Sequence, residues 1–254
     1  MATAAYGQIA QTRSRFHFRM ALVFIAMAFA GFAPTYWVPV AAGRFGGAPI
    51  MHVHGALFFA WTLFYLNQTW LVTSGATANH RRNGMIGAML FGAMLMIIPV
   101  TAINSMWQAE RNFGPEGLEA ARRFTAVPLM SMLVMAGLFS AAMLNVHRSD
   151  IHKRLLLVLN AGMLQAAMGR PFAAMAAANG AVGPPPAIVT LMPAVIVDML
   201  IVAGMVHDKR TTGRVHMAYV VGLGVTVALQ IGMVAIASTD GWLAFATWLQ
   251  HLVR

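Results

Sequence analysis

The chain has 254 residues, of which 59% are hydrophobic and only 9% are charged, whereas soluble domains carry roughly 25% charged residues. A water-soluble fold of this length cannot bury so much apolar surface, so the composition excludes an ordinary soluble domain and predicts an integral membrane protein. The formal net charge is +10, and the absence of cysteine excludes disulfides, thiolate metal sites and haem attached through cysteine.

Seven apolar segments are long enough to cross about 30 Å of hydrocarbon, and we expect one helix in each. Turns that contain proline or glycine separate them. The predicted spans are 19–38, 51–73, 84–107, 126–146, 154–178, 187–206 and 216–237. The sequence therefore predicts an all-α, polytopic transmembrane helix bundle of about seven spans, one leading helix plus three helical hairpins, which forms a single transmembrane domain over residues 1–254.

The distribution of lysine and arginine along the chain predicts a cytoplasmic N-terminus. With that orientation, eleven basic residues lie in inner segments and five in outer segments, as the positive-inside rule requires. Because topology explains the basic excess, we expect no nucleic-acid partner. The expected environment is the lipid bilayer of a bacterial inner (cytoplasmic) membrane, crossed several times.

Two segments outside the spans are predicted to be ordered. Residues 115–125 begin with a proline, which suits the first turn of a helix, so we expect a short helix on the outer surface. Residues 241–254 are too short for an eighth span. They form an amphipathic pattern that is typical of an interfacial helix, with one apolar stripe of Trp242, Phe245, Leu249 and Leu252.

Five histidines fall at the predicted inner ends of five different helices: His80, His147, His152, His207 and His216. Neutral imidazole is a common ligand for zinc, iron and copper, and several of these rings could converge in a compact bundle. Asp150 and Asp208 lie in the same turns and could add carboxylate ligands. The alternative interpretation is that histidine, like lysine and arginine, simply suits the headgroup interface.

A polar and aromatic stripe begins at the predicted outer entrance of the second span. At helical spacing it contains His54, Phe58, Trp61, Tyr65 and Gln68. Such a face could line a pocket for a quinone, the edge of a haem or a lipid headgroup. His52 points about 200° away from His54 on a helix, so the two cannot hold one ion there. The alternative is an aromatic packing seam in which His54 is hydrogen-bonded at the interface.

Polar residues at membrane depth are costly and often functional. Asn67, Asn160 and Asp198 are predicted at similar depths, and Asp198 is the only charged one. Asp198 could handle protons or cations; alternatively, its carboxyl is protonated and bonds to a neighbouring amide or backbone group. Arg170 is predicted nearer the outer side, at about the depth of His54.

The resulting candidate sites lie at two depths. We predict His80, His152 and His216 as primary metal ligands and His147 and His207 as secondary ones. The predicted cofactor-binding residues are His54, Trp61, Tyr65, Gln68, Arg170 and Asp198.

Several short motifs carry a resemblance. The run from His52 to Trp61 (HVHGALFFAW), followed by Gln68 and the motif HRRNG at 80–84, resembles bacterial multi-span membrane families of unknown function. The motifs HKRL at 152–155 and GRVH at 213–216 fit the same families. This resemblance implies an architecture and no activity. A looser similarity is to membrane di-iron hydroxylases and desaturases, but these use His-His doublets, which this chain lacks.

Three hypotheses of function follow. The first is a histidine-rich membrane protein that binds a transition metal (Fe, Cu or Zn) or haem b, in redox chemistry or in assembling a membrane redox enzyme. If it is an enzyme, we expect a metal- or haem-dependent oxidoreductase. The second is a transporter for a small solute or proton, centred on Asp198. The third is a non-catalytic subunit of a larger membrane complex, and a homo-oligomer is also expected as a possible assembly.

Overall fold

The computed structural model describes residues 2–180 and 183–252, with side chains from residue 15 onward. This part of the chain contains helices and no strand, which confirms the all-α prediction. The elements are α1 (Ala2–Phe32), the π-helix η1 (Ala33–Trp37), α2 (Val38–Ala41), α3 (Ile50–Thr73), α4 (Thr77–Phe124), α5 (Ala126–Leu144), α6 (Ser149–Ala178), the 3-10 helix η2 (Ala187–Thr190), α7 (Leu191–Thr212), α8 (Met217–Ala237) and α9 (Asp240–His251).

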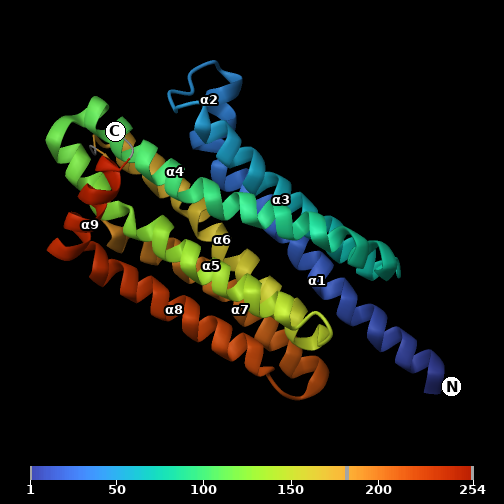
Figure 1. Ribbon diagram of the computed structural model, residues 1–254. Coiled ribbons are helices and arrows are strands. Elements are labelled where there is room, and N and C mark those ends of the chain that lie inside the picture. Colours follow the sequence, from blue (N-terminus) through green and yellow to red (C-terminus); the bar gives the residue numbers. More distant parts are fainter. Residues whose placement is uncertain (1, 181–182, 253–254) are drawn as a thin grey trace.

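The long helices lie side by side and form an elongated bundle with two distinct ends (Figure 1). One end, which we call the histidine end, holds the turns 74–76, 145–148 and 213–216. The opposite end, the α9 end, holds α9, the last part of α4 and the loop 42–49. The predicted metal ligands therefore lie at one end of the bundle, and His54 and Arg170 lie toward the other end.

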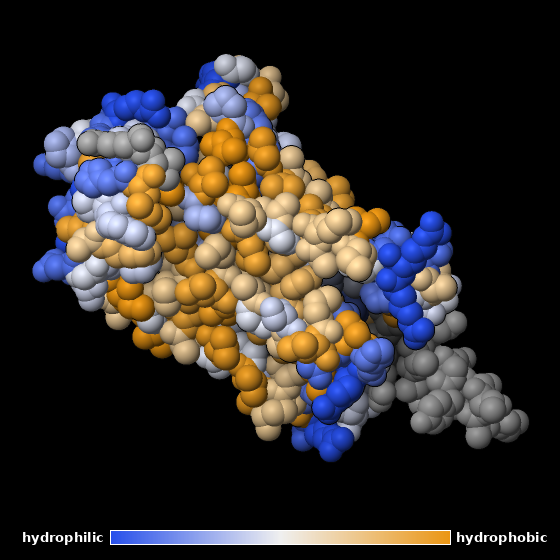
Figure 2. Space-filling model, in the orientation of Figure 1, coloured by the Kyte–Doolittle hydropathy of each residue, from blue (hydrophilic) through white to orange (hydrophobic). Residues whose placement is uncertain are grey.

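The apolar surface is what a lipid environment requires. Four stretches are long and apolar enough to cross a membrane by length and composition: Arg15–Ala41, Thr77–Leu144, Ala187–Thr212 and Met217–Ala237. Figure 2 shows apolar residues across the middle of the visible face and hydrophilic residues toward both ends. These observations indicate a helical membrane protein.

Helices α3 and α6 are outside those four stretches because polar side chains lower their hydropathy. Helix α6 carries Arg154, Asn160 and Arg170. It also packs against α1, α5, α7 and α8, which makes it the most enclosed helix of the bundle. Protein rather than lipid covers much of its surface, so a lower hydropathy is compatible with a central position.

Helix α4 changes direction near the α9 end. Gly114 has φ 67° and ψ −156°, a conformation that is outside the helical region and nearly restricted to glycine. The predicted surface helix at 115–125 is present as the part of α4 beyond this break, and it begins with Pro115 as expected. Its buried residues Leu118 and Ala121 pack with Ala246 of α9, so the segment returns onto the bundle.

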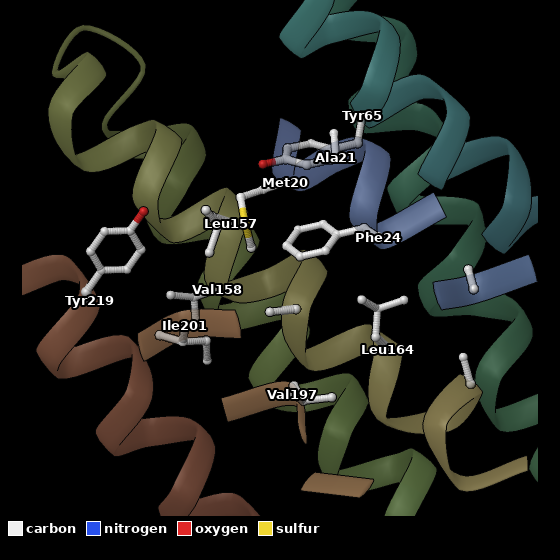
Figure 3. Close-up of a cluster of buried hydrophobic side chains, with 13 residues drawn as sticks. Met20, Ala21, Phe24, Tyr65, Leu157, Val158, Leu164, Val197, Ile201 and Tyr219 are labelled. Atoms are coloured by element: carbon white, nitrogen blue, oxygen red, sulfur yellow. The ribbon is translucent and has the colours of Figure 1, made fainter. Parts of the chain in front are cut away.

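The largest apolar core lies where α1, α6, α7 and α8 meet (Figure 3). Phe24, Leu157, Val158, Ile201 and Tyr219 are each no more than 1% exposed. Their side chains point toward one another from four helices. Burial of a large apolar side chain in a soluble protein is worth about 1.5–3 kcal/mol; within lipid, the gain comes mainly from close packing instead.

Helix α9 forms at the expected place but does not present one continuous apolar stripe. Trp242 and Leu249 are half-buried against α4 and α5, whereas Phe245, Trp248 and Leu252 are exposed. The helix therefore has one side that packs against the bundle and one exposed apolar side.

Candidate functional site

Two of the predicted histidine ligands meet at the histidine end. His80 lies in the first turn of α4 and His152 in the first turn of α6, and their ring centres are 6.4 Å apart with the planes at 79°. His152 Nδ1 is 2.8 Å from the carbonyl oxygen of Ala142. In the tautomer that donates to this carbonyl, the lone pair of His152 Nε2 is left available.

Two buried polar atoms at the histidine end lack a hydrogen-bond partner within the described chain. His80 Nδ1 is buried and has no hydrogen-bond partner within the described chain, and the same is true of the side-chain Nε2 of Gln68. Gln68 itself is 8% exposed, and its backbone carbonyl lies beside the His80 ring. Buried polar groups normally have partners, so the buried Nδ1 of His80 and the buried Nε2 of Gln68 are left unsatisfied within the described chain.

The other predicted metal ligands are placed elsewhere. His216 Nε2 is 3.1 Å from an Asp150 carboxylate oxygen. The His207 ring stacks on Phe16 with centres 4.0 Å apart, and His147 is exposed. Over residues 2–180 and 183–252, no group of three or more His, Asp or Glu side chains is arranged to hold a metal ion. The five histidines therefore share one end of the bundle without converging on one point.

The pKa of the Asp150 carboxyl reflects its contact with His216. Desolvation raises this pKa, but the hydrogen bond from His216, the backbone amides at the start of α6 and the charge of His216 together lower it more. The pKa of Asp150 therefore lies below its usual value of 3.8. Asp150 serves as the partner of His216 rather than as a free carboxylate.

Sequence reasoning did not identify the main contact of Asp208. Its two carboxylate oxygens accept hydrogen bonds from Arg154 Nε and NH2, each at 2.7 Å. Both side chains are buried, at 8% and 4% exposure for Arg154 and Asp208. Asp208 also accepts from the backbone N–H of His216 at 3.3 Å. The sequence showed only that Arg154 and Asp208 both lie near predicted inner turns. Which acid pairs with which base is decided by the packing of the helices.

The second predicted pocket lies toward the α9 end. The His54 ring stacks on Phe58 with centres 4.4 Å apart, and its Nδ1 is buried without a partner in the described chain. The Arg170 guanidinium lies 5.2 Å from the centre of the Phe32 ring, close enough for its charge to act on His54. The structure therefore brings His54 and Arg170 into one neighbourhood, as their predicted depths suggested.

A small cavity lies beside these residues. Its volume is about 40 Å³ and its lining includes Phe32, Phe58, Phe59 and Asn160. At roughly 10–15 Å³ of such space per water molecule, it has room for about three waters and is far too small for a haem. The Trp61 indole N–H donates to Asn160 Oδ1 at 3.0 Å next to it.

The remaining predicted residues do not share a site, and each has its own surroundings. Tyr65 belongs to the largest apolar core. Asp198 accepts a hydrogen bond from Gln230 Nε2 at 3.0 Å, which links α7 to α8. Asn67 is exposed on α3, and Asn160 bonds Trp61 on α3. The three polar residues predicted at similar depth thus face three different surroundings and share no hydrogen bond within the described chain.

Comparisons of the chain with protein-family models, with curated proteins and with solved structures found no match.

Proposed function

We propose that the chain crosses a bacterial inner membrane about seven times, with its N-terminus in the cytoplasm. Helices α1, α3, α5, α6, α7 and α8 and the first part of α4 each have at least 19 residues, which is about 28 Å of helix or more. Arg81, Arg148, Lys153, Lys209 and Arg214 lie near the turns of the histidine end. The positive-inside rule supports a cytoplasmic location of that end.

We further propose that the histidine end binds a transition-metal ion, for redox chemistry or for the assembly of a membrane redox enzyme. The observation that carries this proposal is the distance between the rings of His80 and His152. Two imidazoles on opposite sides of a square-planar or octahedral ion, with metal–nitrogen distances of about 2.0–2.1 Å, have ring centres roughly 6–6.5 Å apart, whereas two imidazoles on a tetrahedral ion have ring centres roughly 5 Å apart. The observed separation of 6.4 Å is in that range.

The hydrogen bonds around the pair support the same proposal. Histidines that bind metals usually donate their other ring N–H to a carbonyl or carboxylate, which fixes the ring. His152 Nδ1 contacts the Ala142 carbonyl in this way. His80 keeps a buried Nδ1 without a partner in the described chain. Imidazole ligands suit copper, zinc and iron, and two protein ligands leave the remaining coordination positions to water or a small substrate.

The test is a metal titration of the detergent-purified protein after chelation. We expect the wild-type protein to bind about one equivalent of Cu, Zn or Fe, measured by elemental analysis after gel filtration. His80→Ala and His152→Ala should each abolish this binding. The control is His147→Ala, which removes an exposed histidine at the same end. A wild-type protein that binds no metal, or an equal loss in the control, would overturn the proposal.

Transport of a proton or small solute is a second candidate function, and Asp198 favours it. Its carboxyl is half-buried within α7 and has the Gln230 amide as its hydrogen-bond donor. An ionisable group within a membrane helix commonly marks an ion or proton route. Asp198→Asn should then abolish proton-coupled uptake into vesicles while leaving metal stoichiometry intact. An additional role as a subunit of a larger membrane complex is compatible with either activity.

A further inference from the structure

Arg170 carries a positive charge that the described chain does not neutralise. Its guanidinium faces the Phe32 ring at 5.2 Å, and no hydrogen bond or ion pair joins it to another described residue. The side chain is half-buried near the end of α6. A guanidinium has five N–H donors, and leaving them unfilled beside apolar surface is costly.

Three more polar groups of this region lack partners within the described chain. They are the buried Nδ1 of His54, the hydroxyl of Thr35 and the indole N–H of Trp37. Thr35 and Trp37 belong to η1, the π-helix that follows α1 and packs on α6. π-helical segments occur frequently at functional sites. These groups lie on η1, which contacts α1 and α6 and touches α3 through Trp37 and Phe59, and on α3 itself.

Aromatic rings connect these groups to the small cavity. The Phe59 ring lies 4.8 Å from the Trp37 ring and 5.8 Å from the Phe32 ring, measured between centres. Phe32 and Phe59 also line the cavity of about 40 Å³. The region thus combines the positively charged guanidinium of Arg170 and several neutral polar groups with the apolar rings of Phe32 and Phe59.

The depth of Arg170 favours an amphipathic ligand. Arg170 is 16 residues from the start of the predicted span 154–178, which corresponds to about 24 Å along the helix axis. On the proposed topology this is the outer part of the hydrocarbon, which is about 30 Å thick, and a long arginine side chain reaches from there toward the headgroups at the α9 end. A ligand with a charged head and an apolar chain would meet both halves of the site there.

We propose that Arg170, His54, Thr35 and Trp37 bind the oxyanion head of an amphipathic molecule, whose apolar chain lies along Phe32 and Phe59. The head is the phosphate of an anionic phospholipid or the carboxylate of a fatty acid. Both present acceptor oxygens with negative charge, which the planar fork of arginine matches. This inference rests on the proposed membrane crossing of α1, α3 and α6 and is independent of the metal site.

The experiment uses the full chain, delipidated in a neutral detergent, and counts bound lipid by native mass spectrometry. The probes are dioleoylphosphatidylglycerol, dioleoylphosphatidylcholine and oleate. We expect one tightly bound phosphatidylglycerol or one oleate and weaker binding of phosphatidylcholine. Retention of phosphatidylglycerol alone assigns the phosphate as the head, and retention of oleate alone assigns the carboxylate. Equal binding of the two phospholipids with no oleate retained would overturn the proposal.

Variants locate the binding within the site. Arg170→Gln should weaken binding of the preferred probe by about 10- to 100-fold, because hydrogen bonds to a charged group are lost. Arg44→Gln is the matched control, since Arg44 is exposed on the loop at the same end, and it should bind as the wild type does. An equal effect of both variants would refute the site. If Arg170→Gln does not fold, Trp37→Phe provides the variant, with a smaller expected loss, and an unchanged affinity there counts against the proposal.

Discussion

Arg154 and Asp208 form a buried, bidentate ion pair that joins α6 to α7 at the histidine end. Both hydrogen bonds are 2.7 Å long. Arg154 also donates to the backbone carbonyl of Asp150 at 2.6 Å, and its guanidinium lies 5.8 Å from the centre of the Tyr219 ring on α8. The pair therefore sets the relative position of three helices beside the His80–His152 site.

Removing one partner of this pair should destabilise the protein strongly. Asp208→Leu leaves the Arg154 charge buried without its counter-ion, and breaking a buried pair in this way typically costs about 3–5 kcal/mol. Thermal unfolding in detergent should show a large fall in midpoint temperature. The double variant Arg154→Met with Asp208→Leu should recover much of the loss, because no charge is then left unpaired. A single variant as stable as the wild type would contradict this account.

The contact between Asp150 and His216 should make stability depend on acidity. The folded-state pKa of Asp150 is lowered, so its stabilising contribution is present above the unfolded-state value of about 4. It is lost as the pH falls through the lower, folded-state pKa. Because the carboxylate is largely exposed, we expect a contribution below about 1 kcal/mol.

The measurement for Asp150 is a comparison of midpoint temperatures across pH 3–7, roughly the range that brackets its titration. Asp150→Asn should be less stable than the wild type at the upper end and should converge with it at the lower end. Parallel curves for the two proteins would show that the carboxylate does not contribute as described.

Helices α1 and α6 approach closely at Gly31. A Cβ atom added there would overlap the backbone carbonyl of Ala167, which cannot move away without shifting α6. Gly31→Ala should therefore lower stability by about 1–3 kcal/mol or more, as overpacked cores do. Gly92→Ala is the control, because a Cβ at Gly92 meets no atom within 4 Å. A chemical-denaturation series of both variants checks this, and equal stabilities would exclude a tight α1–α6 contact.

The helices were predictable from the sequence because their signals are local. The predicted span 51–73 corresponds to Ile50–Thr73, and 216–237 corresponds to Met217–Ala237. Apolar runs set the length of such segments, and glycine and proline mark their ends. The extension of α1 into the π-helix at Ala33–Trp37 was not predicted, because no periodic pattern distinguishes a single π-helical turn.

The candidate sites were predictable only in part, since they depend on which helix faces meet. Shared position at one end of the bundle predicted that His80 and His152 could lie near each other, and their rings are 6.4 Å apart. Similar depth placed His54 and Arg170 in one neighbourhood. The alternative prediction for Asp198, a hydrogen bond with a neighbouring amide, agrees with its contact to Gln230. The sequence did not identify Gln230 itself, or Arg154 as the partner of Asp208, because both lie on other helices and carry no local signal. The predicted α9 stripe is divided for the same reason: packing against α4 covers Leu249 and leaves Phe245 exposed.

The enclosed position of α6 has a consequence for how the protein is made. On the proposed topology, α6 leaves the ribosome before α7 and α8, so Arg154 reaches the bilayer ahead of Asp208. The Arg154 guanidinium therefore has no counter-ion until α7 is made, and we expect α6 to reach its final position only after Asp208 has entered the bundle.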